Sequence, residues 1–491
     1  MTKLAKYTAE LYLGLEEETG QSTGYKVNGS LSIATNEGRL EDLKRRADMA
    51  KVFDLHVDVI NPKDCLDFFP LMNIEDILGG IFIPSDGQAN PIDVTQALAK
   101  GARLGGALIY EDTCVEHIEH DGERVLGVET DAGPVQSDFV VMCCGMWTRE
   151  FAKKINVNVP LHACEHFYVV TEPIPEVTPD FPVFRDYDAS AYFKEDTGKL
   201  LIGAFESDAK PWGMRGIPED FCFDQLPEDL DHFEPILSLG LKRMPILNSV
   251  GIRTFFNGPE SFTNDNLHLM GPVPEINNLF VACGMNSKGI AAAGGLGKIL
   301  TDWIVDGYPS GEVTETDARR NNLVQTTQSY VEARIPEALG HTYAMHWPFY
   351  QYKTARNLWK SPLHDELSDQ GACFGEVGGY ERPNWFGCDV IKPIYKYTYQ
   401  KQNWFDCSAA EHIAVRESTG LYDISSFGKF EISGVGALPT LQRLSCANID
   451  IEIGKVVYTQ WLNDRGGIEA DLTIARLKED RFWITTGIGS L

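Results

Sequence analysis

The chain has 491 residues, more than a single hydrophobic core usually serves, so two or three domains are expected. Hydrophobic residues make up 43% and charged residues 23%, a balance that excludes a disordered or fibrous chain. The 71 acidic residues outnumber the 43 basic ones, and the formal net charge of -28 argues against nucleic acids and anionic membranes as partners.

Few features of the sequence indicate where in the cell the protein is found. No apolar stretch approaches the roughly 18 to 20 residues of a membrane span, so no membrane partner is predicted. The eleven cysteines contain no C-x-x-C pair, which favours a thiol-reducing compartment. We therefore expect a cytoplasmic protein, or one of the mitochondrial matrix if the source is eukaryotic. No metal site is predicted.

The first third of the chain alternates helical and extended patterns. Apolar residues at three- and four-residue spacing predict a helix over residues 2–20 that ends at Gly20. A charged helix is predicted around residues 41–52, and Asn90-Pro91 marks the start of a third helix. Predicted strands share short apolar runs bounded by turn residues, and they lie at 30–35, 77–84, 107–111, 115–120, 125–131 and 138–145. We interpret the later strands as a βαβ unit with an inserted β-meander.

The rest of the chain suggests further domains. Alternating segments between residues 159 and 254 predict an antiparallel sheet, suited to the floor of a substrate pocket. A strand at 278–284 and a Gly- and Ala-rich helix then return the chain to its first domain. The composition afterwards shifts toward Trp, His, Tyr and Pro, which indicates a connector domain. The predicted domains are residues 1–305, 306–383 and 384–491.

The segment GMNSKGIAAAGGLGKILTDWI, which starts at Gly284, crowds small residues around a helix start. Free backbone N–H groups and the positive end of the helix dipole would suit the negative charge that develops at N1/O2 of a reduced flavin. Tight packing of the helix against its neighbours explains the small residues equally well. The segment is not a P-loop, because Ala292 and Ile299 stand where that motif requires Gly and Ser or Thr.

Four segments together resemble the dimethylglycine and sarcosine dehydrogenase family, in family order. They are SDGQANPIDVTQALAKGARLGG from Ser85, VVMCCGMWTREFAKKI from Val140, FNGPESFTND from Phe256 and the Gly284 segment. The resemblance implies a multidomain α/β and α+β protein: a D-amino-acid-oxidase-like FAD domain with an antiparallel substrate-domain sheet, a connector, and a T-protein-like domain. It also implies FAD as cofactor, bound by Val115, Gly145, Trp147, Gly284, Asn286, Lys288, Gly289 and Ile290.

One departure from the family is large. Its members carry a G-x-G-x-x-G strand-turn-helix, which cradles the FAD pyrophosphate, before the residues that align with Met1. A histidine that often bears covalent flavin also precedes that point. This sequence contains no G-x-G-x-x-G. We therefore expect a chain that lacks the first Rossmann βαβ segment and that ends inside its last domain.

Amine oxidation at a flavin requires a neutral amine and a C–H bond aimed at the ring, so groups that set protonation and position are needed. The resemblance assigns these catalytic roles to His166 in HACEHFYVV and Tyr192 in SAYFKED. By sequence alone, each would be an ordinary core side chain. A substrate carboxylate needs a fork-shaped cation, and Arg185, Arg253 and Lys288 stay equal candidates for that role.

Near the C-terminus, AAEHIAVRESTGLYDISSFGKFEISG and VVYTQWLNDRGGIEADLTIARL resemble the start of the folate-binding T-protein of the glycine cleavage system. The family motif G-G-I-x-x-D-L assigns Asp471 to the pterin ring, and a carboxylate can accept two parallel N–H bonds from it. By sequence alone, Asp471 would be an exposed strand-edge residue. Asp423 and Tyr458 lie in matching segments with weaker claims. The implied second cofactor is tetrahydrofolate.

Together the two resemblances predict flavin-dependent oxidative demethylation of an N-methylated glycine, dimethylglycine or sarcosine, with one-carbon transfer to tetrahydrofolate. An electron-transfer flavoprotein or oxygen would take up the electrons. Two alternatives stay open. One is a non-catalytic regulatory subunit similar to that of pyruvate dehydrogenase phosphatase, whose layout is the same. The other is an aminomethyltransferase with a vestigial oxidase half, which would bind folate without reducing flavin.

Overall fold

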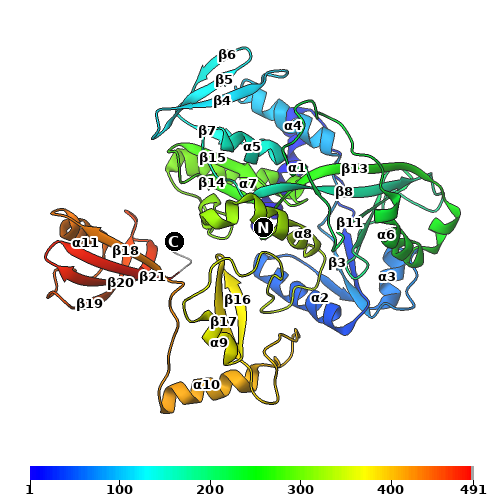
Figure 1. Ribbon diagram of the computed structural model, residues 1–491. Coiled ribbons are helices and arrows are strands. Elements are labelled where there is room, and N and C mark those ends of the chain that lie inside the picture. Colours follow the sequence, from blue (N-terminus) through cyan, green and yellow to red (C-terminus); the bar gives the residue numbers. More distant parts are fainter. Residues whose placement is uncertain (488–491) are drawn as a thin grey trace. The chain divides into compact units, whose positions relative to one another are not determined.

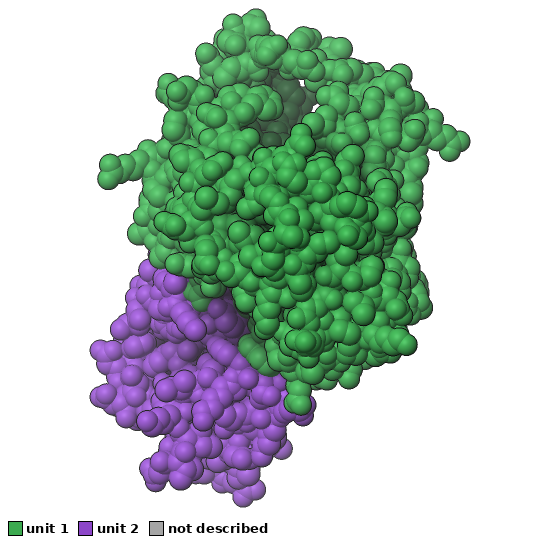
Figure 2. Space-filling model, turned by 90° about the vertical axis from the view of Figure 1, so that its right-hand side faces the viewer, with its two compact units in different colours: residues 1–319, 326–348 green, residues 320–325, 349–491 purple. Residues whose placement is uncertain are grey.

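The computed structural model describes residues 1–487 (Figure 1). The chain divides into two compact units, which Figure 2 shows in different colours. Unit 1 comprises Met1–Arg319 and Thr326–Pro348, and unit 2 comprises Arg320–Gln325 and the residues from Phe349 onward. The residues of the predicted connector, 306–383, are thus shared between the two units. The division into three domains stays a prediction.

Unit 1 is built on a nine-stranded sheet whose order is β12-β8-β11-β10-β9-β1-β3-β2, with β13 also paired to β8. The strands are β1 Ser30–Ala34, β2 Asp58–Ile60, β3 Gly79–Ile83, β8 Leu161–Thr171, β9 Val183–Asp186, β10 Ala191–Glu195, β11 Leu200–Ala204, β12 Pro211–Trp212 and β13 Ile252–Thr263. Every pairing is antiparallel except that of β1 with β9. The predicted antiparallel sheet is confirmed.

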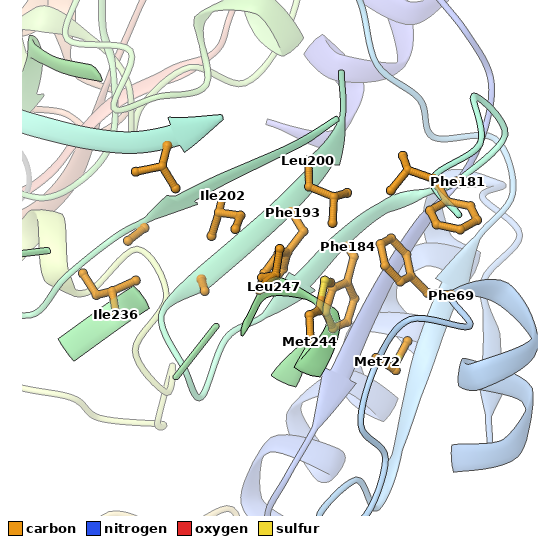
Figure 3. Close-up of a cluster of buried hydrophobic side chains, with 14 of the residues drawn as sticks. Phe69, Met72, Phe181, Phe184, Phe193, Leu200, Ile202, Ile236, Met244 and Leu247 are labelled. Atoms are coloured by element: carbon orange, nitrogen blue, oxygen red, sulfur yellow. The ribbon is translucent and has the colours of Figure 1, made fainter. Parts of the chain in front are cut away.

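One face of this sheet carries the main core of unit 1 (Figure 3). Phe184 of β9 and Phe193 of β10 are fully buried, and their rings stack with centroids 5.3 Å apart. Phe69 packs on Phe184 at 5.2 Å, and burial of each such ring stabilises the fold by about 1.5–3 kcal/mol. Because side chains alternate along a strand, the neighbours of these rings, Arg185 and Tyr192, project from the opposite face.

A second, three-stranded sheet has the order β14-β15-β7, in which β7 Val140–Met142 runs parallel to β15 Leu279–Cys283 and β14 is Leu269–Pro272. The meander β4 Val115–His120, β5 Val125–Thr130 and β6 Gly133–Gln136 forms a separate sheet.

The strand predicted at residues 107–111 is wrong, and so is the βαβ unit built on it, because β3 and β7 belong to different sheets. Leu108 and Tyr110 are 80% and 72% exposed. No strand of residues 1–487 pairs with this segment, so its apolar composition alone does not make it a strand.

The helices of unit 1 begin and end close to their sequence signals. They are α1 Thr2–Thr19, α2 Glu37–Ala50, α3 Pro62–Phe68, α4 Pro91–Leu104, α5 Thr148–Lys153, α6 Leu230–Arg243, α7 Gly289–Asp306 and α8 Gln328–Gly340. Gly20 ends α1 in the left-handed conformation, and the Asn90 side chain caps α4 by accepting from the N–H groups of Ile92 and Asp93. No helix within residues 1–487 has the length and apolarity that a bilayer crossing requires.

Helices α1 and α7 pack at very short range, and glycines permit it. A Cβ atom at Gly295 would lie 2.5 Å from the Leu4 Cα, and one at Gly294 would lie 2.9 Å from a Leu11 methyl group. The Gly295 N–H donates to the Thr8 hydroxyl at 3.0 Å. Helix-on-helix packing therefore explains these two glycines of the Gly- and Ala-rich segment, without any ligand.

Unit 2 holds a hairpin and a four-stranded sheet. The elements are α9 His364–Asp369, β16 Ala372–Val377, β17 Tyr380–Phe386, α10 Phe405–Glu417, β18 Gly428–Ser433, α11 Ala437–Leu444, β19 Val456–Leu462, β20 Ile468–Lys478 and β21 Arg481–Thr486. The sheet order is β18-β21-β20-β19. Leu441, Ile474 and Phe482 form its separate core.

Replacing Gly295 tests the helix packing. We expect Gly295→Ala to lower the free energy of unfolding of unit 1 by about 1–3 kcal/mol, because the new methyl group meets backbone rather than a mobile side chain. Gly297→Ala is the matched control on the same helix, because its Cβ would meet nothing within 4 Å. This control should gain up to about 1 kcal/mol of helix propensity. Urea unfolding followed by circular dichroism measures both, and equal effects would contradict the packing argument.

Candidate active site

A cavity of about 450 Å³ lies in unit 1 among α1, the start of α7 and the face of the nine-stranded sheet opposite the core. Its lining is largely aromatic and small. The lining residues are Ala5, Thr8, Ala9, Tyr12, Tyr25, Asp86, Gly87, Gln88, Ala89, Val183, Arg185, Tyr192, Lys194, Phe205, Ser287, Ile290, Ala291 and Tyr343. Such a volume accommodates a ring system of cofactor size or a small substrate.

Arg185 and Tyr192 are directly opposite each other on β9 and β10 and both line this cavity. The Tyr343 hydroxyl is hydrogen-bonded to the Arg185 guanidinium, while the nearest Asp86 oxygen is 3.8 Å from it. The hydroxyl orients the guanidinium by a direct hydrogen bond, whereas the ion pair with Asp86 is long. Arg185 can therefore offer a fork of N–H donors to a carboxylate.

The other two candidate cations lie elsewhere. Arg253 has a 60% exposed side chain near Glu172, and the Lys288 ammonium donates to the Asn266 carbonyl at 3.3 Å. Neither lines the cavity. Among the three cations that the sequence could not separate, the geometry favours Arg185.

His166 and Tyr192 are brought together, as predicted. The His166 Nε2 lies 3.3 Å from the Tyr192 hydroxyl, and the His166 ring packs on Phe205 with centroids 4.9 Å apart. Tyr192 lines the cavity, whereas His166 does not line it but contacts two of its lining residues, Tyr192 and Phe205. The His166 Nδ1 is buried without a hydrogen-bond partner in the described chain. Their assignment as catalytic residues stays a prediction.

Burial raises the pKa of Tyr192 well above its ordinary value, and the neighbouring Tyr343 and Glu260 add to the effect. The Tyr192 hydroxyl is therefore protonated at neutral pH. It can donate a hydrogen bond to the imidazole of His166 or to the lone pair of a neutral amine. This is the state that amine oxidation requires of a positioning group.

Aromatic rings surround the space beside Arg185. Tyr343 meets Tyr192 edge-on at a centroid distance of 6.4 Å and Phe205 at 4.7 Å, and Tyr12 meets Tyr25 at 6.1 Å. Clusters of aromatic faces bind methylated ammonium groups through cation–π attraction. A cavity with these rings and one arginine suits a small methylated amine that carries a carboxylate.

The cavity also fits a flavin ring. The first helical hydrogen bond of α7 is donated by Ala292, so the N–H groups of Gly289, Ile290 and Ala291 have no partner within the helix. The Gln88 Oε1, which belongs to another lining side chain, is buried without a hydrogen-bond partner in the described residues. Such groups could receive the polar edge of an isoalloxazine, and Ile290 is the predicted FAD contact that lines the cavity.

The remaining predicted FAD contacts lie outside this cavity. Asn286 is 1% exposed, and its side chain accepts from the Thr263 N–H at 2.9 Å and donates to the Gly284 carbonyl at 2.6 Å. Its bonds therefore hold the loop before α7. The other predicted contacts are Val115, Gly145, Trp147, Gly284, Lys288 and Gly289, and of these Trp147 and Val115 are 42% and 40% exposed. Their contact with FAD stays a prediction.

In unit 2, Asp471 lies on β20 and is exposed on the four-stranded sheet. The Tyr458 hydroxyl of the neighbouring β19 donates to the Asp471 carboxylate, and this bond raises the pKa of Tyr458. Asp423 is half-buried and accepts from the Ser425 N–H at 2.9 Å. Asp471 and Tyr458 thus form one polar pair, and Asp423 belongs to a turn.

The sequence did not reveal several residues that line the cavity or support its lining. Tyr343 lies in the segment HTYAMHW, which was assigned to the connector, yet it packs into unit 1. Gly203 is the cross-strand neighbour of Tyr192, and a Cβ there would lie 2.1 Å from the tyrosine ring. Gln88 lies in the family segment that starts at Ser85, but no motif marks it as a cavity residue. Residues 1–487 contain no group of three His, Cys, Asp or Glu side chains that could hold a metal ion.

Comparisons with known proteins identify the family. Residues 1–303 match the model of the FAD dependent oxidoreductase family. The chain belongs to this family. Residues 306–361 match the FAD dependent oxidoreductase central domain, and residues 363–490 match the GCVT N-terminal domain. The predicted family and fold class, with FAD as the cofactor of the family, are confirmed.

Three curated relatives differ in what their names report. The chain is 42% identical to the 4-methylaminobutanoate oxidase (formaldehyde-forming) of Paenarthrobacter nicotinovorans, over 99% of the chain and 59% of the relative. It is 38% identical to the mitochondrial pyruvate dehydrogenase phosphatase regulatory subunit of Mus musculus, over 98% and 56%. It is 35% identical to the mitochondrial sarcosine dehydrogenase of Mus musculus, over 94% and 53%. The chain thus spans little more than half the length of these relatives.

Among solved structures, the fold resembles L-proline dehydrogenase from P. horikoshii, with a TM-score of 0.57 and 23% identity over 65% of this chain and 82% of that one. This likeness concerns the fold alone.

A double-mutant cycle tests the contact between Gly203 and Tyr192. In the wild-type background, Gly203→Ala should lower the free energy of unfolding of unit 1 by about 1–3 kcal/mol, because the methyl group displaces the tyrosine ring. In a Tyr192→Ala background the same change should cost nothing, because the ring is gone. Urea unfolding measures all four proteins. Equal penalties in the two backgrounds would show that Gly203 does not support Tyr192.

Proposed function

We propose that unit 1 oxidises the N-methyl group of a small N-methylated amino acid with FAD as hydride acceptor. The observation that carries this proposal is the arrangement of Arg185, Tyr192 and Tyr343 around one cavity at the start of α7. The guanidinium would hold the substrate carboxylate, and the tyrosines would enclose the methylated nitrogen. The names of two relatives, an oxidase of 4-methylaminobutanoate and a sarcosine dehydrogenase, support this substrate class.

FAD and the residues of the chain would have separate roles in the reaction. A bound FAD would accept two electrons and a proton as hydride from the N-methyl carbon. The substrate nitrogen then carries a CH₂ iminium, which loses its carbon as formaldehyde when water adds. The protonated Tyr192 hydroxyl would hold the lone pair of the neutral amine, with His166 behind it as its hydrogen-bond partner. Arg185 would fix the opposite end of the substrate.

The second part of the proposal is that unit 2 contributes to a tetrahydrofolate site. The pair of Asp471 and Tyr458 supports it, because a carboxylate held on a rigid strand can accept two N–H bonds from a pterin. Tetrahydrofolate would take the one-carbon unit of the iminium in its methylene form. We further propose an electron-transfer flavoprotein as the oxidant that regenerates FAD, and a thiol-reducing compartment for a chain with eleven free cysteines.

A regulatory subunit is the second candidate, because the chain is 38% identical to a protein of that name. The presence of Arg185, Tyr192 and His166 in one constellation favours the enzyme. A subunit without catalytic activity has no need of an arginine that lines an aromatic cavity.

Anaerobic flavin reduction separates the two candidates. The FAD-loaded protein should lose its flavin absorbance when mixed with dimethylglycine, sarcosine or 4-methylaminobutanoate. Arg185→Gln should raise the concentration needed for half-maximal reduction about 10- to 100-fold, because a charged hydrogen bond contributes about 1.5–3 kcal/mol. Arg253→Gln, which removes an exposed arginine, is the matched control and should behave as wild type. Absence of bleaching with all three substrates would favour the regulatory subunit.

Asp471→Asn tests the folate half separately. We expect a reduced folate to bind about 10- to 100-fold more weakly, because an amide cannot accept both N–H bonds of the pterin edge. Asp464→Asn removes an exposed carboxylate from the turn of the same sheet and serves as control. Isothermal titration calorimetry gives both affinities. Equal affinity in the two variants would remove Asp471 from the site.

A further inference from the structure

Unit 1 contains a second cavity, of about 460 Å³, that shares no lining residue with the candidate active site. It lies among the start of β8, helix α5, the segment 213–217 and the first turn of α8. Its walls combine apolar side chains with three cations. The lining residues are Met146, Arg149, Glu150, Lys153, Leu161, His162, Ala163, Gly213, Met214, Arg215, Gly216, Ile217 and Gln328.

Arg149 is the innermost cation, with 6% of its surface exposed. Its guanidinium donates to the Gln328 side chain and to the Thr326 carbonyl at 3.1 Å, and both acceptors are neutral. A guanidinium has five N–H donors, so several are left toward the cavity. In the described chain, the printed hydrogen bonds of Arg149 go to neutral groups, and a buried charge held in this way gains from a ligand that supplies a negative charge directly.

The surrounding charges leave the cavity positive. Lys153 and Arg215 join Arg149 in the lining, while Glu150 is the one carboxylate there among the described residues. Both Glu150 oxygens accept from the Ile217 N–H at 3.1 Å, so this carboxylate is hydrogen-bonded to the segment 213–217. Burial lowers the pKa of Arg149 and outweighs the opposing charges of Glu150 and of Glu332 on α8.

The neighbouring cations also contribute to the low pKa of His162. Its Nδ1 accepts from the Ala163 N–H at 2.8 Å, so its other ring nitrogen carries the proton and faces the Met214 sulfur. Burial, followed by the charges of Arg149 and Lys153, lowers the pKa of His162 to about 4. Burial and Arg149 also lower the pKa of Lys153. Each of these positive charges therefore disfavours the protonation of its neighbours, although the chain as a whole carries a net charge of -28.

We propose that this second cavity binds a small dianion, with Arg149 at its inner end and Lys153 and Arg215 at its mouth. The ligand class is a dicarboxylate or a phosphorylated metabolite. Both chemistries offer two negative charges to three cations and an organic part to the apolar wall of Met146, Leu161 and Met214. The site shares no lining residue with the active-site cavity, and its Met146 lies between Gly145 and Trp147, two of the predicted FAD contacts.

Calorimetric titration of the folded chain with inorganic phosphate and with succinate tests the proposal, and acetate serves as the singly charged comparison. We expect one of the two dianions to bind with a dissociation constant of about 1 mM or tighter, and acetate to bind more weakly. Lys153→Gln and Arg215→Gln should each weaken that dianion about tenfold, since each removes one charged contact. Phosphate binding alone would assign a phosphorylated ligand, and succinate binding alone a dicarboxylate.

Lys154→Gln is the matched control. Lys154 follows Lys153 directly, is exposed and donates to the Glu116 carbonyl outside the cavity, so its loss changes the net charge equally. Affinity that falls equally in Lys153→Gln and Lys154→Gln would reduce the effect to general electrostatics and overturn the proposal. Absence of dianion binding would overturn it as well.

ADP, which shares the pyrophosphate of FAD, is a further probe, and ADP binding that depends on Lys153 would assign the cavity to the cofactor instead.

Discussion

The strand alternation of β9 and β10 is the constraint on which the candidate active site depends. Phe184 and Phe193 are drawn into the core of unit 1, and because neighbouring side chains point to opposite faces, Arg185 and Tyr192 must face the cavity. A shift of one residue in register would bury the arginine in the core, at a prohibitive cost in free energy. The hydrophobic core therefore fixes the positions of the polar groups more firmly than any contact among those groups does.

The start of α7 shows how one segment can serve both packing and a site. Gly294 and Gly295 let α1 approach closely, while Ile290 and Ala291, less than two turns earlier, line the cavity. The two explanations of the small residues, helix packing and cofactor approach, therefore apply to different positions of the same helix. The Tyr12 hydroxyl, which donates to the Ile290 carbonyl at 2.7 Å, ties the two regions together.

The structural features that were predicted correctly are those that depend on residues close together in the sequence. Helix caps such as Asn90 and Gly20 act within one turn, and the alternating strands of the large sheet carry their own pattern, so both were recovered. The segment 107–111 looked like a strand, but a strand exists only where a partner pairs with it. Tyr343 was beyond reach for a related reason, because its contact with Arg185 joins residues 158 positions apart and no local pattern records it.

Four arginines of unit 1 fall into two groups, and the difference separates structure from binding. Arg39 is held by Asp188 at 3.0 Å, and Arg243 by Asp186 at 2.7 Å, so these guanidinium groups are neutralised and bind segments of the fold together. Arg185 and Arg149 are instead hydrogen-bonded to a hydroxyl, an amide and a carbonyl, and the ion pair of Arg185 with Asp86 is longer, at 3.8 Å. Neutral partners fix direction without cancelling charge. In a strongly acidic chain, whose overall field repels anions, cations that are hydrogen-bonded to neutral groups are better placed than tightly paired ones to attract a carboxylate or phosphate, and both of these arginines line cavities.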